Sequence, residues 1–181
     1  ALMRDILFED CDVFDSDRGL VLYARDGGPI ENVCWRNIRL FMIHWPHETG
    51  GTPLQFFITQ RDGLTPVHRI RVENIRANMI VPCGFAGLAG APLDGLILKD
   101  IHLCADRPAV NGSYFRGNRD SFEPDLGDTV GARPAVLKVG DHVDIRFDGL
   151  TIDWQGNRAR WGGLLSEGAQ GVDIRNLIEK P

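Results

Sequence analysis

Apolar and polar residues follow one nine-residue template in five segments of the chain. Apolar residues stand at its second, fourth, seventh and ninth places, and Asn or Asp stands at the sixth place of four segments. The segments are residues 5–13, 32–40, 69–77, 95–103 and 144–152, and a sixth copy at 173–178 starts and then stops. A repeat of this size cannot bury its own apolar face, so it predicts units that stack into a solenoid.

The template itself predicts two short strands joined at a corner. Alternation of apolar and polar residues over the first four or five places is the period of a β-strand. After the fourth place the alternation shifts by one residue, and Asn or Asp at the sixth place tolerates the left-handed backbone of a corner. Helices are not expected, because no window keeps a 3.6-residue stripe and Gly and Pro recur throughout.

A second short apolar run follows every full template, at residues 19–23, 54–59, 83–88, 135–139 and 162–165. Two or three strands in each turn of about 27 residues predict an all-β parallel β-helix of about six coils. We expect one domain over residues 1–181, with loops inserted at 42–53 and 111–134. A leucine-rich repeat is the alternative, but the Leu-x-x-Leu-x-Leu spacing is absent.

The composition limits the kinds of partner and metal site that we expect for this protein. A net charge of −5 and a pI near 5.5 argue against a nucleic-acid surface. No run of 18 apolar residues and no signal-peptide pattern is present, so no membrane partner is expected. The four cysteines lack CxxC spacing, which makes zinc unlikely and leaves a disulfide open. Cys11 occupies an inward place of the template and is expected in the core.

One stretch carries a family resemblance. Residues 17–37, followed by a template strand and a His-Trp loop, read DRGLVLYARDGGPIENVCWRN. They resemble glycoside hydrolase family 28, the polygalacturonase-like clan of pectin lyase-like β-helices, and the similarity covers roughly residues 5–103. The resemblance implies a right-handed parallel β-helix with a groove along one face. It also implies an acidic polysaccharide or oligosaccharide substrate, inverting hydrolysis without a cofactor, and a secreted or periplasmic location.

The chain departs from that family in two places. The family's Asp-Asp and Gly-His-Gly motifs do not occur. Because the first unit opens without a cap, we expect a C-terminal portion of a longer hydrolase, with its acids upstream of Ala1 and no activity of its own. The family's substrate-gripping Arg and Lys align with Val21 and Tyr23, which leaves a neutral or differently charged sugar open.

The loop at 42–53 is the first candidate for sugar contact. It holds His44, Trp45, His47 and Glu48. An exposed Trp stacks on a sugar ring, and His hydrogen-bonds hydroxyl groups or moves protons near neutral pH. Equally, Trp45 can plug the side of the solenoid. A metal site from the two His residues and Glu48 is a poor match to zinc-binding patterns.

Tyr23, Arg25 and Arg61 are the second candidate. Tyr23 and Arg25 alternate outward on one strand, and Arg61 is expected one coil away. Two guanidinium groups beside an aromatic ring suit a carboxylate or sulfate. The competing interpretation is that both Arg residues form salt bridges with the adjacent Asp26 and Asp62.

Three further features are weaker. Asp15 and Asp17 would share a face if extended, at the spacing that inverting hydrolysis needs, but turn residues are common there. Residues 111–133 form the longest non-repetitive segment, with a glycosylation-type tripeptide at Asn111. Trp154 and Trp161 flank an Arg-rich turn that reads as a surface loop with scope for cation–π stacking.

The sequence therefore predicts the later coils of a polygalacturonase-like glycoside hydrolase, with sugar contacts from Tyr23, Arg25, His44, Trp45, His47 and Arg61. Two alternatives stay open: a non-catalytic carbohydrate-binding β-helix, and a polysaccharide lyase that uses calcium and a basic residue. A purely structural solenoid would keep a stricter repeat length and fewer bulky loops.

Overall fold

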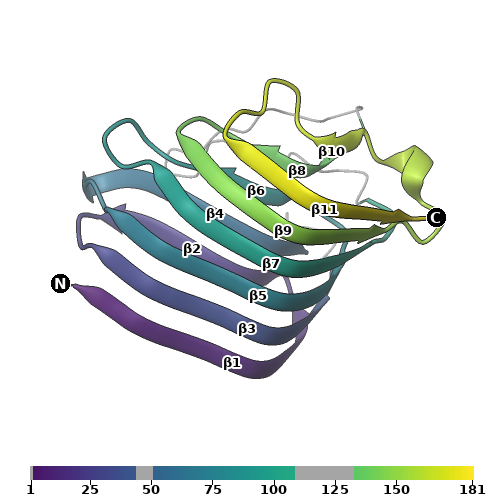
Figure 1. Ribbon diagram of the computed structural model, residues 1–181, viewed down its shortest axis with the longest axis horizontal. Coiled ribbons are helices and arrows are strands. Elements are labelled where there is room, and N and C mark those ends of the chain that lie inside the picture. The colour runs from purple at the N-terminus through teal and green to yellow at the C-terminus, as the bar shows by residue number, and fades with distance from the viewer. Residues whose placement is uncertain (1, 44–50, 109–132) are drawn as a thin grey trace.

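The structure is a computed structural model that describes residues 2–43, 51–108 and 133–181. Its strands form two parallel sheets, a six-stranded sheet A in the order β1-β3-β5-β7-β9-β11 and a five-stranded sheet B in the order β10-β8-β6-β4-β2. The chain alternates between the sheets as it climbs, so each coil adds a strand to both (Figure 1). This is a parallel β-helix of about six coils, as predicted.

The two sheets differ in strand length. Sheet A has long strands: β1 (Met3–Ser16), β3 (Ile30–Met42), β5 (Val67–Met79), β7 (Leu93–Ala105), β9 (Val143–Asp153) and β11 (Val172–Lys180). Sheet B consists of β2 (Arg18–Asp26), β4 (Thr52–Gly63), β6 (Cys83–Ala86), β8 (Ala135–Val139) and β10 (Gly163–Leu165). The one helix of the described ranges is the short 3-10 turn η1 (Arg158–Arg160), and nothing there is long and apolar enough to be a membrane-spanning helix.

Bends occur at the sixth place of the template, where corners are predicted, but each template forms one continuous strand and not two short ones. The sixth-place residues Asp10, Asn37, Asn74 and Asp100 all have φ between 50° and 56°, and Gly149 takes the same place at φ 87°. Their side chains also form a ladder along the stack. Asn37 Nδ2 donates to Asp10 Oδ1 at 2.9 Å, and Asn74 Nδ2 donates to Asn37 Oδ1 at 2.9 Å. Each amide thus stabilises both its own corner and the next coil.

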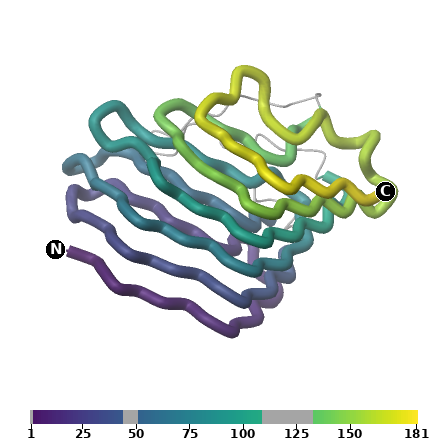
Figure 2. The backbone as a smooth tube through the Cα atoms, viewed as in Figure 1, coloured from purple at the N-terminus to yellow at the C-terminus, as the bar shows by residue number. Residues whose placement is uncertain are grey.

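The inward places of successive templates form continuous files in the core. Ile6 pairs with Val33, Val33 pairs with Ile70, and the same register continues to Leu96, which pairs with Ile145. Ile70 and Leu96 are almost completely buried. Sheet B adds Phe56 and Phe85, whose rings stack at 5.9 Å between centroids. Stacked coils therefore bury each other's apolar faces. The backbone trace shows the successive coils stacked on one another (Figure 2).

Cys11 corrects one prediction. It pairs with Ile38 and so lies in an inward file, but it is exposed whereas Ile38 is 2% exposed. The reason is position: β1 is an end strand of sheet A, so no described coil lies below it. No described cysteine is in a disulfide.

Two further predictions are corrected, one about the last repeat and one about Trp154 and Trp161. β11 runs the full length from Val172 and pairs with β9 throughout, so the sixth copy does not stop. The apolar pattern fails only because Glu179 takes the ninth place, where it accepts a hydrogen bond from Trp154 Nε1 at 3.1 Å. Trp154 and Trp161 are buried, not in a surface loop. The expected cation–π contact does form, with Arg158 Cζ 4.7 Å from the Trp154 ring centroid.

Candidate functional site

Side chains on the outer face of sheet B are unusually buried. Strand alternation points Val21, Tyr23 and Arg25 outward from β2, because Leu22 and Ala24 between them are in the core. In β4, Gln55 and Phe57 pair with Val21 and Tyr23 and share this outer face. Gln55 is 4% exposed and Phe57 is fully buried. The outer face of β4 is therefore shielded from solvent at these two positions, whereas the outer face of a solenoid is usually exposed to water.

The covered face holds a second apolar cluster. Phe57, Val81 and Ala86 pack together outside the main core, and the partly buried Tyr23 lies against them. The rings of Tyr23 and Phe57 meet edge to face at 6.3 Å. Tyr23 is thus held at the margin of an apolar layer, with one side of its ring committed to the protein.

Arg25 and Arg61 lie beside this tyrosine. Arg25 Cζ is 5.4 Å from the Tyr23 ring centroid, within the range of a cation–π contact. Arg61 comes from β4, one coil further, where Asp26 pairs with Gly63 after a register shift. Arg25 therefore lies against the Tyr23 ring, and Arg61 lies on the neighbouring coil, where its guanidinium group contacts Asp26.

Both arginines also make the acidic contacts that the sequence left open. Arg61 Nη2 lies 2.9 Å from Asp26 Oδ2, and Arg61 Nε lies 3.2 Å from Asp62 Oδ2. Arg25 Nε is 3.9 Å from the same Asp26 carboxylate. These pairs are on the surface and so contribute little to stability, but they hold the guanidinium groups side by side.

Three buried polar residues on this face were missed by sequence reasoning. Gln55, Thr59 and Lys138 are each at most 6% exposed. Gln55 and Lys138 lie in one file, with Gly84 between them. Thr59 Oγ1 has no hydrogen-bond partner among the described residues. The signal was available, because these are the polar residues of the runs LQFFIT and AVLKV.

Several predicted residues lie outside the described ranges. His44, Trp45 and His47, together with Glu48 and the segment 111–132, are among them. Asp15 and Asp17 are described, and Asp15 has φ 52°. Asp15 is left-handed instead of extended and lies at the register shift near the end of β1, so the argument that an extended strand places both carboxylates on one face does not apply.

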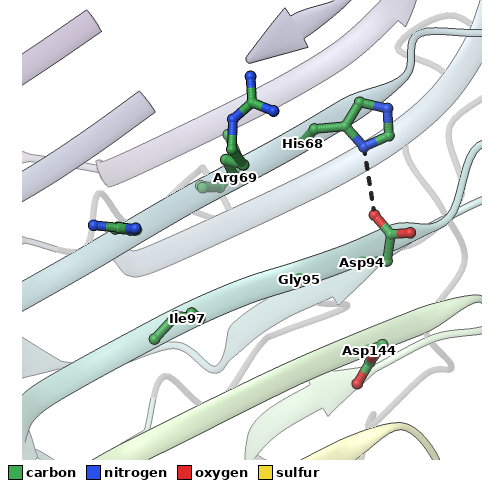
Figure 3. A pocket seen from close by; sticks show the side chains of 8 residues that line it. His68, Arg69, Asp94, Gly95, Ile97 and Asp144 are labelled. Atoms are coloured by element: carbon green, nitrogen blue, oxygen red, sulfur yellow. Dashed lines mark ion pairs between the residues drawn. The ribbon is translucent and has the colours of Figure 1, made fainter. Parts of the chain in front are cut away.

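The outer face of sheet A has a separate hollow of about 430 Å³ (Figure 3). Gly95 leaves room there, and His68, Arg69, Asp94 and Asp144 surround it. His68 Nδ1 lies 3.8 Å from Asp94 Oδ1, and each side chain is about half exposed. Basic and acidic groups are mixed around an open surface, so we assign no binding role to this hollow.

Comparison with known proteins finds no match for this chain among protein-family models, curated proteins or solved structures. The resemblance to the polygalacturonase-like hydrolases therefore stays a prediction from residues 17–37.

Proposed function

We propose that the chain supplies sugar-binding coils of a polysaccharide-degrading glycoside hydrolase of the polygalacturonase type. The observation that carries the proposal is the group formed by Tyr23, Arg25 and Arg61 on the outer face of sheet B. An aromatic ring accepts the apolar face of a sugar, and guanidinium groups bind a carboxylate or sulfate in a bidentate manner. A parallel β-helix supports this role, because it repeats such positions coil by coil along one wall.

The spacing of the coils suits a polymer. Neighbouring strands of a sheet lie about 4.8 Å apart, so side chains in one file follow an extended chain without a change of backbone. Arg25 belongs to one coil and Arg61 to the next, and Asp26 ties the two together. An acidic polysaccharide competes with Asp26 for these guanidinium groups. We assign none of the described carboxylates to the acid–base step of hydrolysis.

Binding to immobilised polysaccharides tests the proposal. We expect the chain to bind polygalacturonate more tightly than a neutral glucan, with an affinity that falls as salt rises. Tyr23→Ala should weaken binding roughly two- to twelvefold, because one aromatic contact contributes about 0.5–1.5 kcal/mol. Arg71→Ala is the matched control for variants that remove Arg25 or Arg61, because it removes a guanidinium group from the outer face of sheet A.

Three results would count against the proposal. Equal binding by the wild type and by an Arg25→Ala, Arg61→Ala double variant would remove the site from sheet B. Absence of binding to any charged or neutral polysaccharide would remove the substrate class. Reducing-end release from polygalacturonate by this chain alone would contradict the assignment of the described residues to binding without hydrolysis.

A further inference from the structure

His102, Cys104 and Asp153 converge on the outer face of sheet A. His102 and Cys104 are two apart on β7, and the residues that alternate with them, Ile101, Leu103 and Ala105, are buried in the core. Asp153 pairs directly with Cys104 from the adjacent strand β9 (Figure 1). Alternation along one strand and register with the next therefore bring three different ligand types to one spot.

The distances suit a metal ion. One ligand atom from each residue lies within 4.8 Å of the other two, and all three residues are half-buried. Cys104 Sγ and His102 Nε2 are 3.9 Å apart. Bond lengths of about 2.3 Å to sulfur and 2.0–2.1 Å to nitrogen place these atoms about 3.6 Å apart around tetrahedral zinc. Small side-chain rotations are enough to close the site.

We propose that His102, Cys104 and Asp153 bind a zinc ion, with the fourth position open to water. A thiolate and an imidazole favour zinc over calcium or magnesium, which take oxygen ligands. One thiolate and one carboxylate together balance the charge of Zn²⁺. Asp153 Oδ1 also accepts a hydrogen bond from the Gln155 backbone N–H at 3.3 Å, which orients the carboxylate as outer-shell contacts do in known metal sites.

Burial is the main influence on the pKa values of both His102 and Cys104. Burial, with Lys180 and Arg76 nearby, lowers the pKa of His102, so its lone pair is free at neutral pH despite the weak opposing effect of Asp153. Burial, with Asp153 and Asp106, raises the pKa of Cys104 against Arg76 and Lys180.

The same residue types also make up a catalytic triad, but the geometry differs. A nucleophilic Cys-His-Asp arrangement is linear, with the histidine between the thiol and the carboxylate. Here the carboxylate lies within 4.8 Å of the sulfur as well as of the imidazole. A negative group beside the sulfur opposes a free thiolate, whereas a cation at the centre of the cluster satisfies all three side chains.

Cobalt titration of the untagged, EDTA-treated chain tests the site. Co²⁺ should produce a thiolate charge-transfer band that saturates at one equivalent, and Zn²⁺ should abolish it. Cys104→Ser should remove the band, and His102→Ala and Asp153→Asn should each weaken zinc binding by more than the roughly 10- to 100-fold cost of losing an outer-shell partner. Cys34→Ser is the matched control, because Cys34 is also a half-buried thiol on the outer face of sheet A.

Thermal unfolding in EDTA shows whether each variant is folded, and zinc should raise the Tm of the wild type and of Cys34→Ser but not of Cys104→Ser. A wild type without the cobalt band overturns the proposal, as does a band lost in Cys34→Ser and kept in Cys104→Ser. Rapid alkylation of Cys104 that excess zinc does not slow would also overturn it, in favour of a thiol nucleophile.

Discussion

The outer faces of the two sheets differ in the charge and burial of their side chains. On sheet A, one outward file of exposed and half-buried side chains crosses all six coils with alternating sign: Glu9, Arg36, Glu73, Lys99, Asp148 and Arg175. On sheet B, the corresponding outward positions of β4 hold Gln55 and Phe57, which are buried. Both inner faces build the same core, so the difference lies entirely outside it.

This contrast supports the proposed site on sheet B more directly than the fold does. Alternating charges on sheet A match each coil to the next and keep the face soluble, which is a structural task. The second apolar layer on sheet B, formed by Phe57, Val81 and Ala86, exceeds what stacking requires. An apolar layer edged by Tyr23 and Arg25 has the composition of a ligand-binding surface.

Truncation of one phenylalanine on each face should give the largest difference. Phe57→Ala should cost about 3–5 kcal/mol of unfolding free energy, because the ring is fully buried. Phe41→Ala on sheet A should cost no more than about 1.5 kcal/mol, since its ring is 44% exposed and mainly stacks on Phe14. Urea unfolding measures both, and equal losses would show that the two outer faces do not differ.

The corner ladder on sheet A should come next. Asn74→Ala removes the hydrogen bond to Asn37 and places Ala at φ 50°, which should cost about 1–2 kcal/mol. Asn74→Gly also removes the amide but tolerates the left-handed backbone, so it should cost less. The two variants unfolded side by side separate the hydrogen bond from the backbone term. A larger loss for Gly would contradict the role assigned to the corner.

The template predicted the coils and corners because period and turn chemistry are local properties. Exposure was harder to predict. Cys11 has an inward place yet no described coil beneath it, and Trp154 lies in the main core and donates a hydrogen bond to Glu179 from the next coil. The zinc-type cluster was missed for a related reason. His102 and Cys104 form a short His-x-Cys pattern on β7, whereas Asp153 comes from β9 on the next coil. Only the pairing register between β7 and β9 shows that the three residues meet.

Cys83, on the inner face of sheet B, should lower the free energy of unfolding as the pH rises above 9. Burial raises the pKa of its thiol to about 12, against 9.0 ordinarily. The unfolded chain loses this proton first, so the contribution is complete below pH 9 and is lost as pH rises toward 12. At pH 10 the loss is roughly 1.4 kcal/mol.

Urea unfolding at pH 7 and pH 10 measures that slope. Cys83→Ala is the comparison, because other groups titrate equally in both proteins and cancel in the difference. We expect the wild type to lose about 1.4 kcal/mol more than Cys83→Ala between the two pH values. Parallel losses would mean that the thiol is not sealed from water between the sheets.

Reversal of one charge on sheet A should have the smallest effect. Arg36→Glu removes the contact with Glu9 and places a third acidic group between Glu9 and Glu73. The variant should melt below the wild type at low salt and approach it in 1 M NaCl, where screening acts within about 3 Å. Arg36→Gln is the control, since it deletes the cation without adding repulsion and should fall between the two.

The salt dependence decides what the charged file does. Exposed pairs contribute little singly, so the file matters only if its alternation is summed over six coils. A second change, Glu9→Arg in the Arg36→Glu background, restores one cross-coil pair and should recover part of the lost Tm at low salt alone. If Arg36→Glu melts with the wild type at every salt concentration, the outer face of sheet A is merely solvated, and the contrast with sheet B rests on burial without any help from charge.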